Sequence, residues 1–166
     1  MSNSKSNKII KEKGYMSKSK TNSWATPKYI YDKLYKIFKF DKTFDPCPYN
    51  PDWKEGDADG RDKDWSDITF INPPYSQLKT TKKKIGWIEK GHMECQKGKT
   101  IIFLIPARTD TTWFHDIILK NNYRVKFIKG RVKFKNENSK SLSAPFPSII
   151  VIMKKYKTNM KIGIEF

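Results

Sequence analysis

Two short apolar runs, Ile68–Ile71 and Thr100–Ile105, each end at a proline-containing turn and constrain the fold more than any other feature of the sequence. Their length and β-branched residues are typical of buried strands, because a strand covered on both faces has apolar side chains throughout. Residues 82–96, between the two runs, predict a helix. Its inward side chains are expected to be Ile85, Ile88 and Met93. Strands separated by helices favour an α/β sheet with helices on both faces.

The remaining elements are predicted from the same patterns of apolar residues and turn residues. The predicted helices are 27–39, which begins at Thr26 or Pro27, and 113–119. The inward face of the first helix is expected to consist of Tyr29, Ile30, Leu34, Ile37 and Phe38. The further predicted strands are 43–45, 123–128, 131–134 and 148–153, and the predicted loops are 49–66 and 135–147. Because short turns join the last strands, they favour an antiparallel edge to the sheet.

The length of 166 residues fits one domain, and the composition separates an arm from it. Residues 1–22 are rich in Ser, Asn and Lys and predict a basic flexible arm, whereas residues 23–166 have the apolar patterning of a folded domain. The sequence contains no apolar run that could span a membrane and no secretory signal, so a soluble, cytoplasmic protein is expected. Cys47 and Cys95 form no CxxC pair, which favours reduced thiols.

The net charge of +17 comes from 34 basic and 17 acidic residues and indicates a polyanionic partner such as nucleic acid. The alternative is an A/T-rich genome, whose codons enrich lysine without any selection for binding. The charge is also sorted along the chain, because nine acids lie between Asp41 and Asp67, while residues 120–140 hold eight bases and one acid. The acidic segment suits a small cationic ligand, and the basic segments suit phosphates.

Asn72-Pro73-Pro74-Tyr75 directly follows the first apolar run and resembles the (D/N/S)PP(Y/F/W) signature of amino-methyltransferases. The motif suits methylation of a planar amine, whose lone pair is delocalised. Hydrogen bonds from the amine to the Asn72 side-chain oxygen and the Pro73 carbonyl localise that lone pair toward a methyl donor. The fixed torsion of proline aims the carbonyl, and Tyr75 offers a flat face on which a flipped base stacks. The alternative is a strand that ends in a Pro-Pro turn with a packed tyrosine.

Several further motifs accompany this signature in a fixed order. They are Trp24-Ala25-Thr26-Pro27, Phe44-Asp45-Pro46-Cys47-Pro48, Asp64-Trp65, Pro106-Ala107-Arg108-Thr109-Asp110-Thr111 with Trp113-Phe114-His115, Gly130-Arg131 with Phe134, and Ala144-Pro145-Phe146-Pro147-Ser148. From Trp24 to about Met153, the set resembles the phage-type (Dam-like) DNA N6-adenine methyltransferases. The resemblance implies a Rossmann-like, S-adenosylmethionine-dependent methyltransferase sheet, with S-adenosyl-L-methionine as donor. It also implies an adenine flipped out of double-stranded DNA as acceptor, in the cytoplasm of a bacterium or a phage-infected host cell.

The resemblance assigns donor binding to three parts of the chain. Trp24, Thr26 and Pro27 match the W-x-TP element that is expected near the methionine end of the donor. Asp45, followed by Pro46, matches the acid that meets the amino group of the donor. Asn72 is assigned to the donor site as well as to catalysis. For Asp45, the alternative is an aspartate that caps a turn.

The segment between Asp45 and Asn72 departs from the usual methyltransferase pattern. It has neither a glycine triplet nor a clear second strand, so the sheet is expected to be abbreviated after its first strand. The acid that would hold the ribose hydroxyls is therefore open among Asp57, Asp59 and Asp64.

Basic residues on both sides of the predicted site are the expected phosphate contacts. They are Lys79, Lys82, Lys83, Lys84, Arg108, Lys129, Arg131 and Lys133. Any one of these lysines alone is equally explained as a solvated side chain, and a local ion pair between Arg108 and Asp110 is the alternative for that arginine. His115 is expected to pack on an apolar helix face, and the two histidines and separated cysteines predict no metal site.

The sequence therefore predicts a site-specific DNA methyltransferase that acts on N6 of adenine. The same four-residue chemistry leaves two other acceptors open, which are adenine in RNA and a glutamine side chain in a protein. A non-catalytic nucleic-acid-binding protein on this fold is the alternative from another class.

Overall fold

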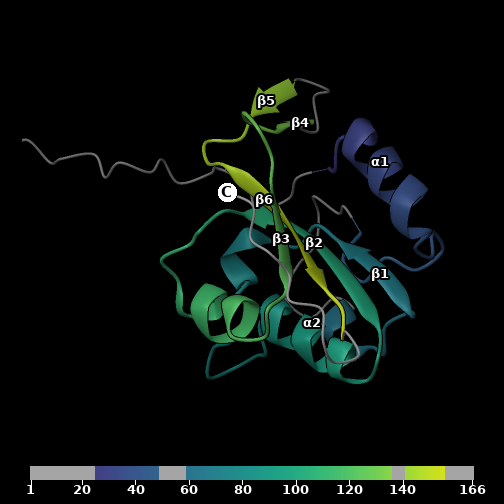
Figure 1. The fold of residues 1–166 in the computed structure, drawn as a ribbon, viewed down its shortest axis with the longest axis vertical. Coiled ribbons are helices and arrows are strands. Elements are labelled where there is room, and N and C mark those ends of the chain that lie inside the picture. The colour runs from purple at the N-terminus through teal and green to yellow at the C-terminus, as the bar shows by residue number, and fades with distance from the viewer. Residues whose placement is uncertain (1–24, 49–58, 136–140, 156–166) are drawn as a thin grey trace, which may run out of the picture.

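The computed structural model describes residues 25–48, 59–135 and 141–155, so the predicted arm at residues 1–22 and Trp24 lie outside the described residues. The helices of these parts are α1 (Lys28–Phe38), α2 (Trp87–Gln96), the 3-10 helices η1 (Gly60–Asp62) and η2 (Tyr75–Gln77), and the π-helix η3 (Phe114–Leu119) (Figure 1). The strands are β1 (Ile68–Ile71), β2 (Thr100–Pro106), β3 (Arg124–Phe127), β4 (Lys133–Lys135), β5 (Ser141–Ser143) and β6 (Ser148–Met153).

Four strands form a mixed sheet in the order β1-β2-β6-β3. β1 and β2 are parallel, whereas β6 is antiparallel to both of its neighbours, so β1, β2 and β3 run in one direction and β6 in the other. The ends of β1, β2 and β3 therefore share one edge of the sheet with the beginning of β6. We call this end of the strands the carboxyl edge, and we call the opposite end, where β1 and β2 begin, the amino edge. Neither name refers to an outer strand of the sheet. β4 and β5 form a separate hairpin.

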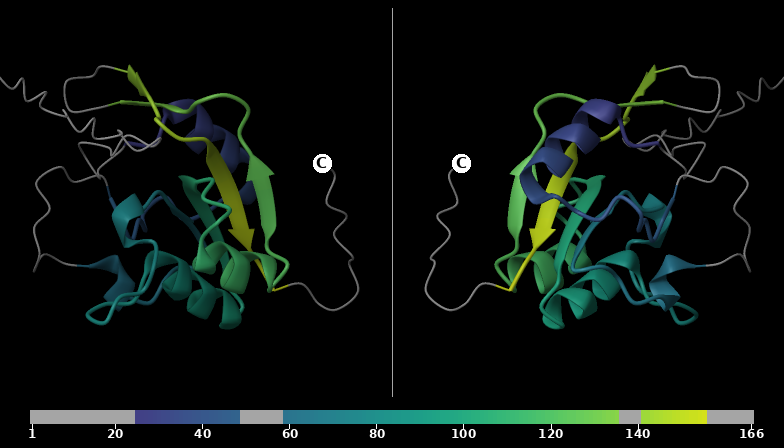
Figure 2. Two further views of the ribbon diagram at one scale, coloured as in Figure 1. Left: turned by 90° about the vertical axis from the view of Figure 1, so that its left-hand side faces the viewer. Right: turned by 90° about the vertical axis from the view of Figure 1, so that its right-hand side faces the viewer.

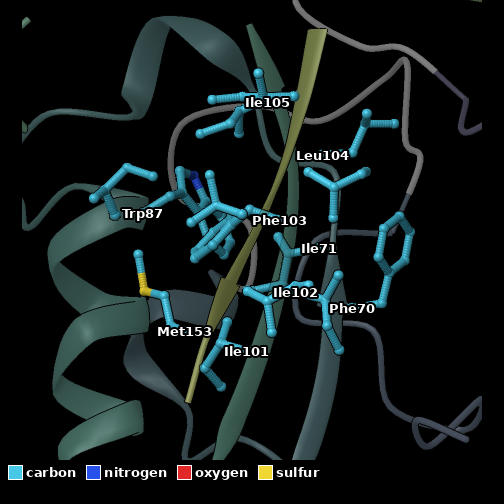
Figure 3. Packing of buried hydrophobic residues seen from close by; sticks show 14 of the residues in the cluster. Phe70, Ile71, Trp87, Ile101, Ile102, Phe103, Leu104, Ile105 and Met153 are labelled. Carbon is cyan, nitrogen blue, oxygen red and sulfur yellow. The ribbon is translucent and has the colours of Figure 1, made fainter. Parts of the chain in front are cut away.

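Helices lie on both faces of this sheet, as the alternation of side chains along each strand shows. On one face, the ring of Tyr31 in α1 lies 5.9 Å from the ring of Phe70. On the other face, a Cβ at Gly91 of α2 would lie 2.5 Å from the ring of Phe103, so glycine lets this helix approach β2 closely. Figure 3 shows Phe103 and Met153 on one side of the strands and Phe70 and Leu104 on the other. The prediction of a mixed α/β fold is confirmed.

The antiparallel strand predicted for the end of the chain exists, but it lies inside the sheet and not at its edge. All six residues of β6 are buried and all but Ser148 are apolar, which suits a strand with neighbours on both sides. β3 is mostly exposed and forms the outer strand beside it. Figure 2 shows this arrangement from two sides, with α1 and the β4–β5 hairpin at the same end of the molecule.

The predicted helix at 82–96 begins only at Trp87. The preceding residues form a loop, in which the Gly86 N–H donates to Thr80 Oγ1 at 2.8 Å and the Thr81 N–H donates to the Lys84 carbonyl at 2.9 Å. Side-chain bonds of this kind compete with helix formation. Ile88 is buried as predicted, but the prediction for Met93 is wrong, since it is 51% exposed.

The predicted helix at 27–39 is confirmed as α1, but two of its expected inward residues face solvent. Tyr29 is 60% exposed and Ile37 62% exposed, whereas Ile30 and Leu34 are buried. The reason is Phe40, a buried residue just beyond the helix. The rings of Tyr31 and Tyr35 pack edge-on against the Phe40 ring, with centroids 5.1 and 5.4 Å away, and this contact rotates α1 relative to the expected face.

The short strand predicted at 43–45 is absent from this described segment. One backbone bond, from the Asp41 N–H to the Ile68 carbonyl at 3.2 Å, joins this part of the chain to β1. The carboxylates of Asp41 and Asp45 instead accept the N–H groups of the residues two positions on, which closes turns in place of a strand.

Candidate active site

Four segments that are distant in the sequence meet at the carboxyl edge. Asn72–Tyr75 follows β1, residues 107–110 follow β2, residues 128–132 follow β3, and residues 144–147 precede β6. Backbone hydrogen bonds join the last three of these segments. The Ala107 N–H donates to the Pro147 carbonyl at 2.9 Å, the Ile128 N–H to the Ser148 carbonyl at 3.1 Å, and the Ala144 N–H to the Val132 carbonyl at 2.8 Å. These four segments, each of which contains residues of the sequence motifs, are thus collected along one edge of the sheet, where α/β proteins bind their ligands.

Asn72 and Tyr75 are joined by a side-chain hydrogen bond. The Tyr75 hydroxyl donates to Asn72 Oδ1 at 2.8 Å. Tyr75 is only 8% exposed, and burial raises the pKa of its phenol well above the ordinary value. The hydroxyl therefore stays protonated and remains a donor at any physiological pH. The side-chain oxygen that is predicted to accept an amine hydrogen bond already accepts one from a neighbouring O–H group.

The backbone of the motif presents a second acceptor. The carbonyl of Pro74 accepts the Gln77 N–H at 3.0 Å and so begins η2. The carbonyl of Pro73, by contrast, is bonded to no donor of the described residues. Pro73 itself is buried, which together with its ring holds this carbonyl in one orientation.

The Tyr75 ring packs between two phenylalanines from the end of the chain. Its centroid lies 5.4 Å from that of Phe146 and 6.5 Å from that of Phe134, both in edge-to-face geometry. Phe146 comes from the segment before β6, and Phe134 from β4. The sequence places both residues in the motif set but gives no sign that they meet Tyr75. Their position in that set is the only signal that could have suggested a shared site.

Two of the predicted donor residues, Thr26 and Pro27, lie at the start of α1. Trp24 lies outside the described residues. Pro27 is buried and is the N-cap of α1, where its carbonyl accepts the N–H groups of Ile30 and Tyr31, and Thr26 beside it is half-buried. Burial, and then the charge of Asp45, raise the pKa of Tyr31 in this helix.

Asp45 is exposed as a residue, but the surrounding protein partly desolvates its carboxyl, which raises the pKa of this group. Its Oδ1 accepts the Cys47 N–H at 2.9 Å, so the turn-capping role proposed as its alternative is real. Pro46 is buried against Gly60, where any Cβ would overlap the Pro46 carbonyl oxygen. This close approach fixes the turn that carries Asp45. Asp45 forms no ion pair with another described residue.

The two described candidates for a ribose-binding acid are both engaged elsewhere, and Asp57 lies outside the described residues. Asp59 forms a buried ion pair with Arg61 at 2.6 Å. Although burial opposes its ionisation, the hydrogen bonds and charge of Arg61 hold the pKa of Asp59 at about 2. Asp64 lies at the amino edge and pairs with Lys97 and Lys99. Both described aspartates are therefore engaged in ion pairs, and the acid that would hold the ribose hydroxyls stays open.

The predicted phosphate contacts fall into two groups. In the loop before α2, Lys79, Lys82 and Lys83 are exposed, but Lys84 pairs with Asp62 at 2.5 Å and Asp59 at 3.4 Å, so its charge is largely compensated. At or beyond the carboxyl edge, the exposed basic residues are Arg108, Lys129, Arg131 and Lys133. Arg108 and Asp110 form no ion pair with each other.

His115 is not packed as predicted, because it is exposed and its Nε2 lies 2.7 Å from the Thr109 carbonyl oxygen. Within residues 25–48, 59–135 and 141–155, no three His, Cys, Asp or Glu side chains are grouped closely enough to hold a metal ion. None of the helices in these ranges is both long enough and apolar enough to cross a membrane.

Comparison with known proteins gives one match. The family model described as DNA N-6-adenine-methyltransferase (Dam) matches residues 13–164. No curated protein and no solved structure matches the chain. The matched range includes every motif that meets at the carboxyl edge, from Asn72–Tyr75 to the segment before β6. With nearly the whole chain covered, this protein belongs to the DNA N-6-adenine-methyltransferase (Dam) family.

Proposed function

We propose that this protein transfers a methyl group from S-adenosyl-L-methionine to N6 of adenine in double-stranded DNA, at the carboxyl edge of the sheet. The observation that carries the proposal is the arrangement of two acceptors beside one aromatic ring. Asn72 Oδ1 accepts a hydrogen bond from the Tyr75 hydroxyl, which an N–H group of a ligand can replace. The Pro73 carbonyl next to it is bonded to no described donor. An exocyclic amine has two N–H groups, and each of these two acceptors can take one of them.

The chemistry follows from this pair. The amine replaces the Tyr75 hydroxyl on Asn72 Oδ1 and donates its second hydrogen to the Pro73 carbonyl. As the nitrogen becomes tetrahedral, both hydrogen bonds strengthen and localise the lone pair. When bound, the donor would supply the methyl group to this nitrogen as its S–C bond breaks and leaves the electron pair on sulfur, and the methylated amine would then lose a proton to water. Asn72 and Pro73 hold the amine throughout this step.

The residues near α1 fit the donor that the family implies. The carboxylate of Asp45 is exposed, is paired with no described base, and so can receive an ammonium group. Thr26 and Pro27 lie at the start of α1, and Pro46 packs against Gly60 and fixes the turn that carries Asp45. S-adenosyl-L-methionine, when bound, supplies an activated methyl group on a positively charged sulfur. We assign Trp24 to the same site on the strength of its motif.

The base is held by stacking. In the base-free protein the edge contacts with Phe146 and Phe134 fix the plane of the Tyr75 ring. A flipped adenine gains stacking energy on an aromatic face without any demand for a particular sequence. Exposed Lys79, Lys82, Lys83, Arg108, Lys129, Arg131 and Lys133, with the basic arm at residues 1–22, hold the phosphates on either side, and Lys84 contributes less because it is paired.

We also propose that β1, β2 and β3 with their helices are an abbreviated Rossmann-like sheet, in a domain of residues 23–166. Three strands run in one direction, have helices on both faces and end at one edge, which is the arrangement that a nucleotide-containing donor uses. We propose that the protein acts in the cytoplasm of a bacterium or a phage-infected host cell.

The test is the identity of the product. The protein is incubated with the donor and with duplex DNA, RNA or a glutamine-containing peptide, and the digests are analysed by mass spectrometry. We expect N6-methyladenine from DNA. N6-methyladenine from RNA alone, or methylglutamine from the peptide, would assign the same residues to another acceptor. Tight DNA binding with no methylated product from any of the three would make this a non-catalytic binding protein.

A further inference from the structure

β3 is the outermost strand of the sheet and is the least covered part of it. Its inner side pairs with β6, and no strand of the described residues pairs with its outer side. Arg124, Lys126 and Phe127 are all exposed, and Val125 is half-buried. Figure 2 shows β3 at the outer side of the sheet, away from β1. We call Arg124, Lys126 and Phe127 the β3 rim.

The rim has positive charge without compensation. Neither Arg124 nor Lys126 forms an ion pair with another described residue, whereas the lysines at the amino edge are paired with Glu94 and Asp64. Past the end of β3, exposed Lys129 and Arg131 continue the same positive surface toward the carboxyl edge. The surface is therefore complementary to a polyanion.

Phe127 distinguishes this surface from an ordinary basic edge. Charged residues on an edge strand prevent pairing with another chain, and this purpose alone would explain Arg124 and Lys126. It does not explain Phe127, which directly follows Lys126 and, because side chains alternate along a strand, projects from the opposite face of β3 to Arg124 and Lys126. At 69% exposure, it is the most exposed large apolar side chain among the described residues. Many DNA-binding proteins combine phosphate-binding bases with an apolar side chain that presses against or between base steps.

Phe127 lies at a useful distance from the site. It is the last residue of β3, so it lies at the carboxyl edge, as Asn72 does after β1. Neighbouring strands are about 4.8 Å apart, so three intervals separate β1 from β3 by about 14 Å. At 3.4 Å per nucleotide this corresponds to about four base pairs. A duplex that delivers an adenine to Tyr75 can reach the rim without a large bend.

We propose that the β3 rim is a second DNA-binding surface, on which Arg124 and Lys126 bind phosphates and Phe127 contacts a base step about four base pairs from the target adenine. The inference rests on the proposed function in taking duplex DNA as the partner. It adds a surface that phosphate contacts around the site do not include, and it gives the apolar contact a role separate from the charges.

Salt dependence separates the two kinds of contact. Affinity of the full-length protein for a mixed-sequence 30-base-pair duplex is measured over a series of salt concentrations. Arg124→Gln with Lys126→Gln should lower the log-log slope by about two, since each lost phosphate contact removes roughly 0.9. Phe127→Ala should weaken binding by roughly tenfold with the slope unchanged, because an apolar contact releases no counterions.

Matched controls lie on the outer face of α1. Lys33→Gln with Lys36→Gln removes the same charge from exposed positions, and Ile37→Ala removes an apolar side chain that is 62% exposed. Rim variants that behave like these controls would overturn the proposal. So would a Phe127→Ala variant that changes the sedimentation of the protein but not its affinity for DNA, since the partner would then be a second copy of the chain.

The same preparations are assayed for N6-methyladenine, so the two proposals fail separately. Product from the wild type together with rim variants equal to the controls removes only the rim. Absence of product from the wild type together with weakened binding of the rim variants removes the proposed methylation and leaves the rim as a DNA-binding surface.

Discussion

Glu94, beside the start of β2, is fully buried and bonded to three lysines, whereas Arg108, just beyond the end of the same strand, is exposed and paired with no described carboxylate. The Glu94 carboxylate receives Lys90 Nζ at 2.6 Å, Lys99 Nζ at 2.7 Å and Lys97 Nζ at 2.9 Å. These lysines cover the carboxylate, so Glu94 is buried because the whole cluster is in place. At the amino edge, the charges of Glu94 and its lysine partners therefore compensate one another.

The carboxyl edge is organised in the opposite way. Its cations are exposed and form no ion pair among the described residues, and the Asn72 side-chain oxygen accepts a hydrogen bond from the Tyr75 hydroxyl. Charges that are satisfied within the protein contribute to folding, because breaking a buried pair leaves an uncompensated charge. Charges that remain in solvent contribute little to folding and are available for a partner. The comparison separates charges that are compensated within the protein from charges that are exposed to a partner, within one small sheet.

Removal of Glu94 should give the largest effect on stability. Glu94→Ala leaves three lysines crowded without their shared carboxylate, so we expect a loss of about 3–5 kcal/mol in the free energy of unfolding, measured by urea denaturation. Asp64→Ala is the control, because Asp64 touches two of the same lysines from an exposed position and should cost far less. A comparable loss in both variants would mean that burial of the cluster is unimportant.

Acid should weaken the same cluster. Burial opposes ionisation of Glu94, but its lysine partners hold its pKa at about 2, below the unfolded value near 4.5. Because the folded pKa is lowered, the stabilisation is complete above about pH 4.5 and is lost as the pH falls toward 2. The free energy of unfolding should therefore fall less steeply over this range in Glu94→Gln than in the wild type. Parallel curves for the two proteins would contradict the assignment.

At the carboxyl edge, Tyr75 should affect base binding through its ring. Tyr75→Ala should lose roughly 1–3 kcal/mol of transition-state binding, measured as kcat/KM. Tyr75→Phe keeps the ring and loses only the bond to Asn72, so it should retain substantial activity. An adenine in a mismatch should partly rescue Tyr75→Ala, because it needs less energy to leave the stack. Equal losses in the Ala and Phe variants would show that the hydroxyl, and not the ring, is required.

Arg108 should give the smallest effect, confined to DNA binding. Arg108→Gln should lower the log-log salt slope of DNA affinity by about one and leave the melting temperature unchanged. Lys36→Gln, which removes an exposed charge from α1, should leave the slope as it is. A lower melting temperature for Arg108→Gln would show that the two edges are less different than their ion pairs suggest.

The sequence predicts best where one local pattern is sufficient. The strands at 68–71, 100–105 and 148–153 are apolar throughout or nearly so, and all three are confirmed with boundaries within one residue. The place of β6 between β2 and β3 depends on pairing across the chain, which no local pattern contains. The prediction for the inward face of α1 is partly wrong for a similar reason, because contacts with Phe40 determine which side chains of this helix are buried.

For the site, the position of Asn72–Tyr75 after a strand places the motif at the correct edge. The sequence does not predict that Tyr75 donates to Asn72 and packs against Phe146, because these contacts depend on a loop that returns from the far end of the chain. Nor does the sequence predict that Lys84, unlike the neighbouring lysines, is ion-paired. Only the ion pairs with Asp59 and Asp62 show that this lysine is already engaged.

The most direct test of the account compares the turnover and the donor affinity of Asn72→Ala. The Asn72 acceptor is needed as the amine becomes tetrahedral, so turnover on duplex DNA should fall by roughly 100-fold or more. Donor affinity, measured by calorimetry, should stay near the wild-type value, and Asp45→Ala should show the reverse pattern. Asn121→Ala, at an exposed position near the amino edge, should change neither quantity. Undiminished turnover in Asn72→Ala would contradict the assignment of the carboxyl edge as the catalytic site.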